Sequence, residues 1–281
     1  MEKNMLRAMF RRFLDEDIGR GDLTSEAIFP AQQTGQARLV ARHGFVVAGA
    51  MTVAAEVFTT QNPDIVAAEA AADGRRVAPG EVLLNVSGPV VDLLKAERVA
   101  LNLLQRLSGI ATLTADFVDR VKGYPVRIID TRKTTPGLRV LEKYAVRVGG
   151  GSNHRFNLTD GVLIKDNHIA ACGSIAEAVV RARRAAPHTV RIEVETDTLE
   201  QVEECLRCGV DIIMLDNMSP QQMRVAVTTI AGRALVEASG GVRLETVAAI
   251  AASGVDIISV GALTHSAPAC DIGMDWLVSE R

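Results

Sequence analysis

The chain has 281 residues, a formal net charge of −3 and an isoelectric point near 6.0, and it is long enough for two domains, each with its own core. The slightly acidic balance argues against a nucleic-acid-binding protein. The longest apolar runs fall short of the roughly 20 residues that a membrane span needs, so we expect a cytoplasmic protein with a small ligand.

The first part of the chain predicts a small α/β domain. Apolar residues over Met5–Leu14 have the spacing of one helical face, and residues 16–30 contain turn signals that predict a loop. Residues 36–49 and 67–91 hold short apolar runs broken by Gly and Pro, a pattern typical of strands and turns. Leucine-rich residues 92–122 then predict helices that join this domain to the next.

From residue 126 onward, a strand-plus-helix unit repeats. Six short apolar runs lie at residues 126–129, 162–164, 190–194, 211–215, 234–236 and 256–260. Helical patterns between them include residues 174–186, 199–208 and 244–252. The spacing predicts a parallel α/β barrel with fewer than eight strands. The expected division is an N-terminal α/β domain at 1–112, the barrel at 113–266 and a tail at 267–281.

Cationic and imidazole side chains follow the first two of these strands. They are Arg132, Lys133, His154, Arg155 and Lys165. Lysine and arginine often lie on the surface with the charge in water, so each alone would mean little. Because barrel enzymes place their chemistry at the carboxyl ends of the strands, we expect the five to converge on a ligand with more than one anionic group.

Glycine-containing loops follow the last two strands. Ser239-Gly240-Gly241 is expected to lead into a helix, and Gly261-Ala262 repeats the pattern on the next strand. Glycines let backbone N–H groups approach an oxyanion, and a helix N-terminus favours negative charge. The two loops therefore predict a phosphate site, although tight turns without a ligand are an alternative.

Acidic side chains end the two middle strands. Glu195 and Asp216 could neutralise Lys133 and Lys165, or they could hold Mg²⁺ and accept ribose hydroxyls once a phosphorylated ligand is bound. Glu193 points to the same strand face as Glu195 but lies a layer deeper, so we rank it second. No nucleophile paired with a base is evident, which favours substitution driven by positioning and electrostatics.

Arg98 and the cysteines have modest interpretations from the residues alone. Arg98 follows Glu97 in a predicted helix and is read as a local charge, with a neighbour such as Asp92 or Asn102. Among the cysteines only Cys205-Leu-Arg-Cys208 has a suggestive spacing, and no second pair of ligands accompanies it. We therefore expect reduced, structural thiols rather than a zinc or redox site.

The strings TRKTTPGLR, GGGSNHR, LIKDNH, EVET, MLDN, EASGG and SVGALTHS, preceded by EDIGRGD and ERVALN, resemble the quinolinate phosphoribosyltransferase family from end to end. The resemblance implies synthesis of nicotinate mononucleotide from quinolinate and phosphoribosyl pyrophosphate, with release of pyrophosphate and CO₂, in de novo NAD synthesis. It also implies Mg²⁺ and a dimer or larger assembly. The tail would return to the N-terminal domain, which would pack over the partner subunit's open barrel.

Residue roles carry over by motif. The resemblance implies that the quinolinate carboxylates are held by Arg132, His154 and Arg155. Both substrates would be contacted by Lys133 and Lys165. The ribose and the metal would be faced by Glu195 and Asp216. The 5-phosphate would bind the loops at Ser239, Gly240, Gly241, Gly261 and Ala262. Arg98 would enter the neighbouring subunit's quinolinate pocket, against its local interpretation, so that each site is shared.

Two other classes of function remain open at this point. Lys165 or Lys133 could form a Schiff base as in a barrel aldolase, but the additional arginines argue against that chemistry. The chain could also be a non-catalytic or differently specific homologue of the molybdenum-transport type. The intact TRKT and NHR strings favour the enzyme. Rates, regulation, oligomer size beyond a dimer and the order of substitution and decarboxylation do not follow from sequence.

Overall fold

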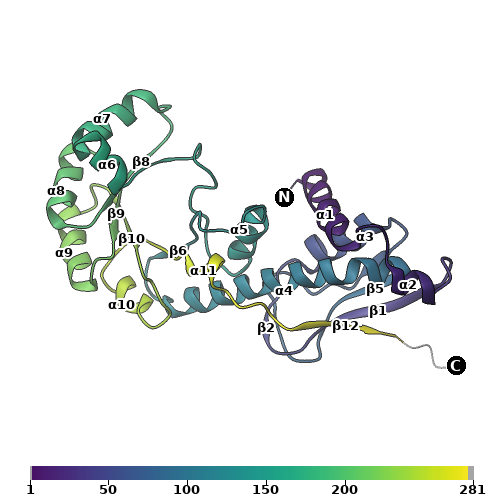
Figure 1. Cartoon of the computed structure of the whole chain (residues 1–281). Coiled ribbons are helices and arrows are strands. Elements are labelled where there is room, and N and C mark those ends of the chain that lie inside the picture. The colour runs from purple at the N-terminus through teal and green to yellow at the C-terminus, as the bar shows by residue number, and fades with distance from the viewer. Residues whose placement is uncertain (1, 278–281) are drawn as a thin grey trace. The chain divides into compact units, whose positions relative to one another are not determined.

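The computed structural model describes residues 2–277; residue 1 and the last four residues of the predicted tail lie outside the described part. The chain folds into two compact units (Figure 1). Within the described residues, the first contains 2–113, Val140–Gly149 and 267–277, and the second contains Thr114–Arg139 and Gly150–Ser266. The division differs from the expected one at Val140–Gly149, which had been placed with the barrel.

An antiparallel sheet forms the centre of the first unit, with strand order β12-β1-β5-β3. The four strands are β1 (Thr34–Ala41), β3 (Val66–Ala68), β5 (Val82–Pro89) and β12 (Ile272–Trp276). A second, two-stranded sheet pairs β2 (Phe45–Val46) with β4 (Arg76–Val77). Because β12 pairs with β1, the end of the chain belongs to the same sheet as its beginning.

The helices that begin in the first unit are α1 (Lys3–Ile18), α2 (Leu23–Ile28), the π-helix η1 (Ala50–Ala55), α3 (Glu56–Gln61) and α4 (Val90–Arg120). The prediction of a loop is wrong over α2. The carboxylate of Asp22 accepts hydrogen bonds from the backbone N–H groups of Thr24 and Ser25 and so caps this short helix. No helix of the described chain is long and apolar enough to cross a membrane.

Helix α5 (Arg139–Val148) explains why residues 140–149 belong to the first unit. The carboxylate of Glu142 is fully buried and accepts a hydrogen bond from the Arg106 guanidinium at 2.8 Å. The Tyr144 hydroxyl donates to the carboxylate of Asp73. A buried carboxylate needs such a partner, and both Arg106 and Asp73 belong to the first unit.

The second unit contains a six-stranded, all-parallel sheet in the order β6-β11-β10-β9-β8-β7. The strands are β6 (Arg127–Ile129), β7 (Val162–Ile164), β8 (Ile192–Thr196), β9 (Ile212–Asp216), β10 (Leu235–Ser239) and β11 (Ile257–Ser259). Strands β6 and β7 end the sheet, so the barrel is open. The predicted α/β barrel with fewer than eight strands is confirmed, and all six strands lie within a few residues of their predicted positions.

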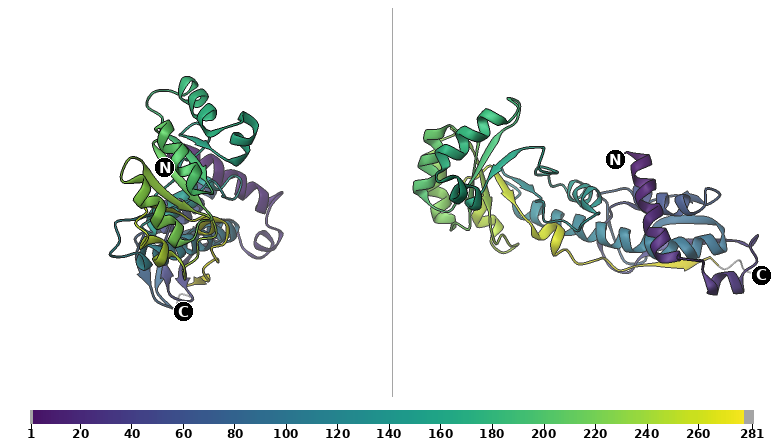
Figure 2. Two further views of the ribbon diagram at one scale, coloured as in Figure 1. Left: turned by 90° about the vertical axis from the view of Figure 1, so that its left-hand side faces the viewer. Right: turned by 45° about the horizontal axis from the view of Figure 1, so that its top comes forward.

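The helices of the second unit lie along one face of this curved sheet, as Figures 1 and 2 show. They are α6 (Asp166–Cys172), α7 (Ile175–Ala185), α8 (Leu199–Cys208), α9 (Pro220–Ile230) and α10 (Val247–Ala251). The short helix α11 (Ala262–His265) follows β11 and lies apart from this row (Figure 1). Helices α7, α8 and α10 confirm the predicted ones. Side chains on the other face of the sheet are left to form the inside of the open barrel.

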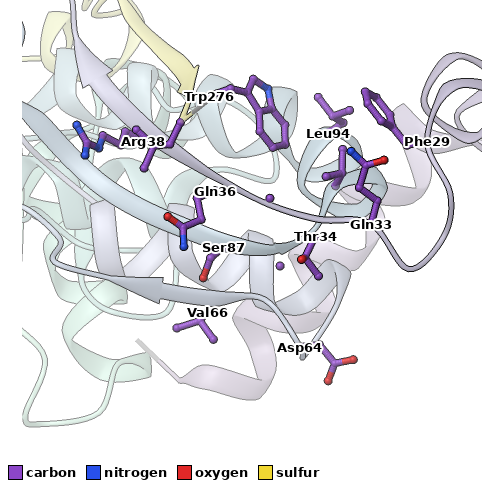
Figure 3. Close-up of a pocket in the computed structure, with 14 residues that line it drawn as sticks. Phe29, Gln33, Thr34, Gln36, Arg38, Asp64, Val66, Ser87, Leu94 and Trp276 are labelled. Atoms are coloured by element: carbon purple, nitrogen blue, oxygen red, sulfur yellow. The ribbon is translucent and has the colours of Figure 1, made fainter. Parts of the chain in front are cut away.

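A large hollow in the first unit does not have the chemistry predicted for the site (Figure 3). It measures about 1230 Å³ and has two charged residues in its lining, Arg38 and Asp64. The ring of Trp276 lies over Gly35, where an added Cβ would come within 2.7 Å of it. The cationic cluster is found instead in the second unit.

Candidate active site

The Asp130 side chain ties two parts of the site together. Asp130 follows β6 directly, is fully buried, and accepts hydrogen bonds from the backbone N–H of His154 at 2.9 Å and the amide of Asn153 at 2.5 Å. These bonds hold the segment with His154 beside the strand end that leads to Arg132 and Lys133. Sequence reasoning assigned no role to Asp130, although its place at the end of an apolar strand was a signal.

The backbone of Lys133 is fixed by the loop that follows β11. The Thr264 hydroxyl donates to the carbonyl oxygen of Lys133 at 2.8 Å. A Cβ added to Gly261 would lie 3.2 Å from Cδ of Lys133, so the lysine stem passes close to this loop. On its other side, the Arg139 guanidinium donates to the Thr134 hydroxyl at 2.9 Å. The first and last strands of the barrel, β6 and β11, are neighbours in the sheet, and the loops that follow them meet at Lys133.

Arg132 and Arg155 lie near each other. Burial lowers the pKa of Arg155 from its ordinary value, and the positive charge of Arg132 lowers it further. The Arg155 guanidinium also donates to the carbonyl oxygen of Gly161 at 2.9 Å. Two partly buried guanidinium groups with mutual repulsion form a place that an anion would stabilise.

Lys165 at the end of β7 forms an ion pair with Glu195 on β8. The side chain of Glu195 is 13% exposed and that of Lys165 is 44% exposed. Asp216 at the end of β9 accepts a hydrogen bond from the Asn217 amide at 2.6 Å instead. Of the two acidic residues, Glu195 thus neutralises a lysine, Lys165. A lysine in an ion pair is not the uncharged amine that a Schiff base requires, which disfavours the aldolase alternative.

The loop after β10 depends on glycine. Gly240 has φ +88°, and an added Cβ would lie against the Asn217 amide and 2.7 Å from its backbone nitrogen. Gly241 also has a positive φ, +58°. The predicted helix after this loop is α10, but it begins only at Val247, several residues beyond Gly241. Phosphate binding at Ser239–Gly241 would therefore use loop N–H groups without a helix N-terminus directly behind them.

A buried cluster lies one layer deeper in the sheet. The Nε2 atom of His154 is 3.4 Å from Oε2 of Glu193 and 3.7 Å from Oε1 of Glu237. Burial raises the pKa of Glu237 to about 7, with a further contribution from the charge of Glu193, while His154 lowers it. Glu193 was ranked second among the acidic residues, and Glu237, directly after the apolar run at 234–236, was placed at a strand end without a role of its own.

Arg98 is not among the residues that the second unit brings together. It is an exposed residue of α4 in the first unit. Asp92, suggested as its local partner, accepts hydrogen bonds from Gln61 at 2.9 Å and Asn62 at 2.7 Å. Within residues 2–277 the Arg98 side chain makes no hydrogen bond or ion pair, although its charge opposes the effect of burial on the pKa of Glu97. The interpretation of Arg98 as a local helix charge paired with Asp92 is therefore not supported.

Two carboxylates at the strand ends have the chemistry to hold a divalent cation. Glu195 and Asp216 end the neighbouring strands β8 and β9. Mg²⁺ typically takes one or two protein carboxylates and completes its shell with phosphate and water, so these two residues suit a metal that arrives with a phosphorylated substrate. Among the described residues, the only group of three potential ligands is His154, Glu193 and Glu237, which was not predicted to bind metal.

Comparison with known proteins covers nearly the whole chain. The family model "Quinolinate phosphoribosyl transferase, C-terminal domain" matches residues 110–275, and the model of the family's N-terminal domain matches residues 22–108. The chain belongs to the quinolinate phosphoribosyltransferase family. A relative from Bacillus subtilis, described as a probable nicotinate-nucleotide pyrophosphorylase (carboxylating), is 48% identical over 100% of this chain and 96% of its own.

Other family members agree in sequence and in fold. A quinolinate phosphoribosyltransferase (decarboxylating) from Nicotiana tabacum is 39% identical over 96% of this chain and 81% of its own length. The crystal structure of NadC from Streptococcus pyogenes superposes with a TM-score of 0.94 at 43% identity and covers 99% of both chains. The open barrel with a separate antiparallel domain is therefore the fold of the family.

Replacing Glu237 by Gln should remove a pH dependence of stability. Since burial raises the pKa of Glu237 from 4.5 to about 7, the folded state keeps a proton that the unfolded state releases in this window. The stabilisation by that proton is complete below about pH 4.5 and is lost as the pH rises through about 7. Urea unfolding should show the wild type losing roughly 1–3 kcal/mol more than Glu237→Gln across this window.

The exposed Glu245→Gln variant is the control for this experiment, since it makes the same chemical change on the surface. Its unfolding free energy should follow that of the wild type at every pH. Parallel curves for wild type and Glu237→Gln would contradict the assignment of a buried, proton-bearing carboxyl group.

Proposed function

We propose that this chain transfers the phosphoribosyl group of phosphoribosyl pyrophosphate to quinolinate with decarboxylation, forming nicotinate mononucleotide, pyrophosphate and CO₂. Membership of the family supports the proposal. The observation that carries it is the pair of neighbouring guanidinium groups, Arg132 and Arg155, at the carboxyl edge of an open barrel. Other strand ends of the same parallel sheet carry the Lys165–Glu195 ion pair and two glycine-containing loops.

Quinolinate is a pyridine with two adjacent carboxylates. Two carboxylates on neighbouring ring atoms need two cations that are close together, and the charge of Arg132 is near enough to lower the pKa of Arg155, which supports their assignment to this pair. Arginine binds a carboxylate through two parallel hydrogen bonds, so each guanidinium can fix the direction of one carboxylate as well as neutralise it. The ring nitrogen is then held in one orientation, which is the main contribution that positioning can make to the reaction.

The reaction is a substitution at C1 of the ribose followed or preceded by loss of one carboxylate. The nitrogen lone pair forms the new bond to C1, and the electrons of the C1–oxygen bond leave with pyrophosphate. When the carboxylate next to the ring nitrogen departs as CO₂, its bonding electrons remain on the ring carbon. The positive ring nitrogen stabilises this pair until a proton replaces the lost group.

Glu195 and Asp216 act on the ribose and on the metal in this proposal. Positive charge develops at C1 as pyrophosphate leaves, and two carboxylates near the ribose would stabilise that charge. Both residues would hold Mg²⁺, which when bound neutralises part of the charge on the leaving pyrophosphate. Lys133 and Lys165 would contact both substrates, with Lys165 exchanging its partner Glu195 for a phosphate or carboxylate oxygen.

The 5-phosphate of the ribose would bind at Ser239–Gly241 and Gly261–Ala262. Positive φ values at Gly240 and Gly241 turn successive backbone N–H groups in a way that favours an anion-binding concavity. Gly261 brings the second loop against the stem of Lys133, so a phosphate between the loops would also meet that ammonium group. This arrangement keeps the ribose between the pyridine pocket and its own phosphate.

The direct test is incubation with quinolinate, phosphoribosyl pyrophosphate and Mg²⁺, with chromatography for nicotinate mononucleotide. Quinolinate should be consumed, and nicotinate should be used hardly at all. Nicotinate lacks one carboxylate and would leave a guanidinium without its partner, a loss of roughly 2–5 kcal/mol for a desolvated charge pair. Similar turnover of the two acids would contradict the assignment of a dicarboxylate pocket.

Mutation should distinguish a role of Glu195 and Asp216 in the reaction from mere neutralisation of lysines. Asp216→Asn and Glu195→Gln should fold normally, lose most activity, and weaken binding of phosphoribosyl pyrophosphate with Mg²⁺ more than binding of quinolinate. Calorimetric titration of each substrate provides the measurement, and Glu245→Gln serves as the surface control. If either variant keeps nearly wild-type turnover at saturating Mg²⁺, the mutated residue has a structural role only.

We also propose a homodimer or larger assembly in which Arg98 completes the neighbouring subunit's quinolinate pocket. The exposure of Arg98 without an ion pair supports this role among the described residues, since a cation intended for another subunit needs no partner in its own. A barrel mouth covered by a second subunit would also exclude water, which strengthens every charge interaction inside.

Subunit mixing tests this shared site. Arg98→Ala and Lys165→Ala should each be nearly inactive. A dimer with one of each has one interface that combines an intact Lys165 pocket with an intact Arg98. Since half of a statistical mixture is mixed dimers with one working site of two, activity should recover to about a quarter of the wild-type value. If activity does not recover although the subunits have exchanged, Arg98 acts within its own subunit and the site is not shared.

A further inference from the structure

Arg139 has no assigned role, yet its guanidinium contacts both segments that carry the arginines of the dicarboxylate pocket. Its Nε donates to the Thr134 hydroxyl at 2.9 Å, and its Nη2 donates to the carbonyl oxygen of Arg132 at 3.4 Å. Its Nη1 donates to the carbonyl oxygen of Phe156 at 3.2 Å. A single side chain of the second unit therefore joins the backbone after β6 to the residue that follows Arg155.

A tight turn brings Arg139 to this position. The backbone N–H of Leu138 donates to the carbonyl oxygen of Thr135 at 3.0 Å, and Gly137 within this turn has φ +84°. Residues with a Cβ rarely adopt that backbone conformation, whereas glycine does so without strain. The chain thus comes back to Thr134 at the point where α5 begins.

The acceptors of Arg139 are all neutral oxygens, and among residues 2–277 no carboxylate pairs with it. A guanidinium presents donors on three nitrogens in one plane, so it can fix three acceptors that lie in different directions. Arg132 is the opposite case, because its Nε is buried and has no hydrogen-bond partner in the part of the chain that the structure describes. Arg132 thus retains a donor for a ligand, whereas Arg139 uses its nitrogens on the protein.

The alternative role for Arg139 is that of one more cation for the substrate. Its Nε and both terminal nitrogens already donate to the protein, which argues against this role. Lysine at the same position distinguishes the two roles, because an ammonium group keeps the charge but lacks the planar set of donors.

We propose that Arg139 is a positioning residue that sets the separation between Arg132 and Arg155, and with it the selectivity for two adjacent carboxylates. This role rests on the proposed function for its substrate. The two carboxylates of quinolinate have a fixed separation, and paired hydrogen bonds from a guanidinium to each of them tolerate little change in the distance between the guanidinium groups. A monocarboxylate needs one guanidinium only, so its binding depends less on that distance.

Kinetics of Arg139→Gln test this role. KM for quinolinate should rise about tenfold or more with kcat changed little, which is the pattern of lost substrate binding. KM for phosphoribosyl pyrophosphate should stay within about threefold of the wild type, because the backbone of Lys133 is held separately by the Thr264 hydroxyl. The inhibition constant of nicotinate, a monocarboxylate, should also change by less than about threefold.

Two further variants separate positioning from charge and from stability. Arg139→Lys should raise KM for quinolinate as much as Arg139→Gln does, since it cannot hold the three acceptors. Arg233→Gln is the matched control: Arg233 also donates to two carbonyl oxygens, those of Ile230 and Thr229 at 3.1 and 2.6 Å, but it precedes β10 and so lies at the opposite end of that strand from the site. This variant should lower the free energy of unfolding without changing either KM.

Chemical rescue tests the guanidinium group itself. Methylguanidinium added to Arg139→Ala should lower KM for quinolinate toward the wild-type value, whereas methylammonium at the same concentration should not. Wild type and Arg233→Gln in the same solutions show the effect of the salts alone.

Hydrogen exchange provides a test without substrate. The backbone N–H of Thr134 donates to the carbonyl oxygen of Arg132 at 2.9 Å, and that of Phe156 donates to the Asp160 carboxylate at 2.8 Å. Without Arg139 both segments lose a common support, so in Arg139→Gln both amides should exchange about tenfold faster or more. Their exchange in Arg233→Gln should follow that of the wild type.

Each result has a defined meaning. An unchanged KM for quinolinate in Arg139→Gln, nearly wild-type kinetics in Arg139→Lys, or the same KM shift in Arg233→Gln would overturn the positioning role. If Arg139→Gln fails to fold, as judged by circular dichroism, the kinetics and hydrogen exchange of Arg139→Lys decide. A wild-type protein that does not convert quinolinate would refute the proposed function, whereas hydrogen exchange at Thr134 and Phe156 would still test the link through Arg139.

Discussion

Burial of charge on the inner face of an open parallel sheet is the constraint on which the rest of the second unit depends. Side chains alternate along each strand, so Glu193 and Glu195 on β8 face inward at two depths, as do Glu237 and Ser239 on β10. Glu195 and Ser239 in the upper layer are partly exposed, whereas Glu193 and Glu237 in the lower layer are buried. Buried carboxylates are tolerated when donors or cations lie nearby, and here the imidazole of His154 lies next to both.

Much of this architecture could be predicted from the sequence because its signals are local. A strand covered on both faces appears in the sequence as a run of three to five apolar residues, which can be recognised locally. The polar residue that follows the run marks the carboxyl end of the strand. For this reason Lys165 after β7 and Asp216 at the end of β9 lie where they were expected. The glycine-containing loop at position 240 was also predicted from the sequence. In the structure, the positive φ of Gly240 and its close approach to Asn217 leave no room for a side chain.

The features that sequence reasoning missed depend on contacts between distant parts of the chain. Helix α5 was assigned to the barrel by its place in the sequence, yet its buried Glu142 requires Arg106, which is 36 residues away. Asp130 acquires its role only when the segment 24 residues later returns to it. Glu237 was visible at the end of the apolar run 234–236, but its place beside Glu193 and His154 depends on strands β8 and β10 and on the segment after β6, which are distant in the sequence.

The ligand-free site is arranged so that substrate binding resolves interactions that the protein alone leaves unfavourable. Arg132 and Arg155 repel each other, and the cost increases because burial removes water from the guanidinium groups. A dianion relieves the repulsion at both groups, whereas a monoanion relieves it at one, so selectivity follows from the protein's own electrostatics as much as from shape. Lys165 shows the complementary case, since its ion pair with Glu195 satisfies both residues until a ligand replaces one partner. In the proposed reaction, binding would free the Glu195 carboxylate where positive charge develops, and occupation of the pocket would thus be coupled to assembly of the catalytic groups.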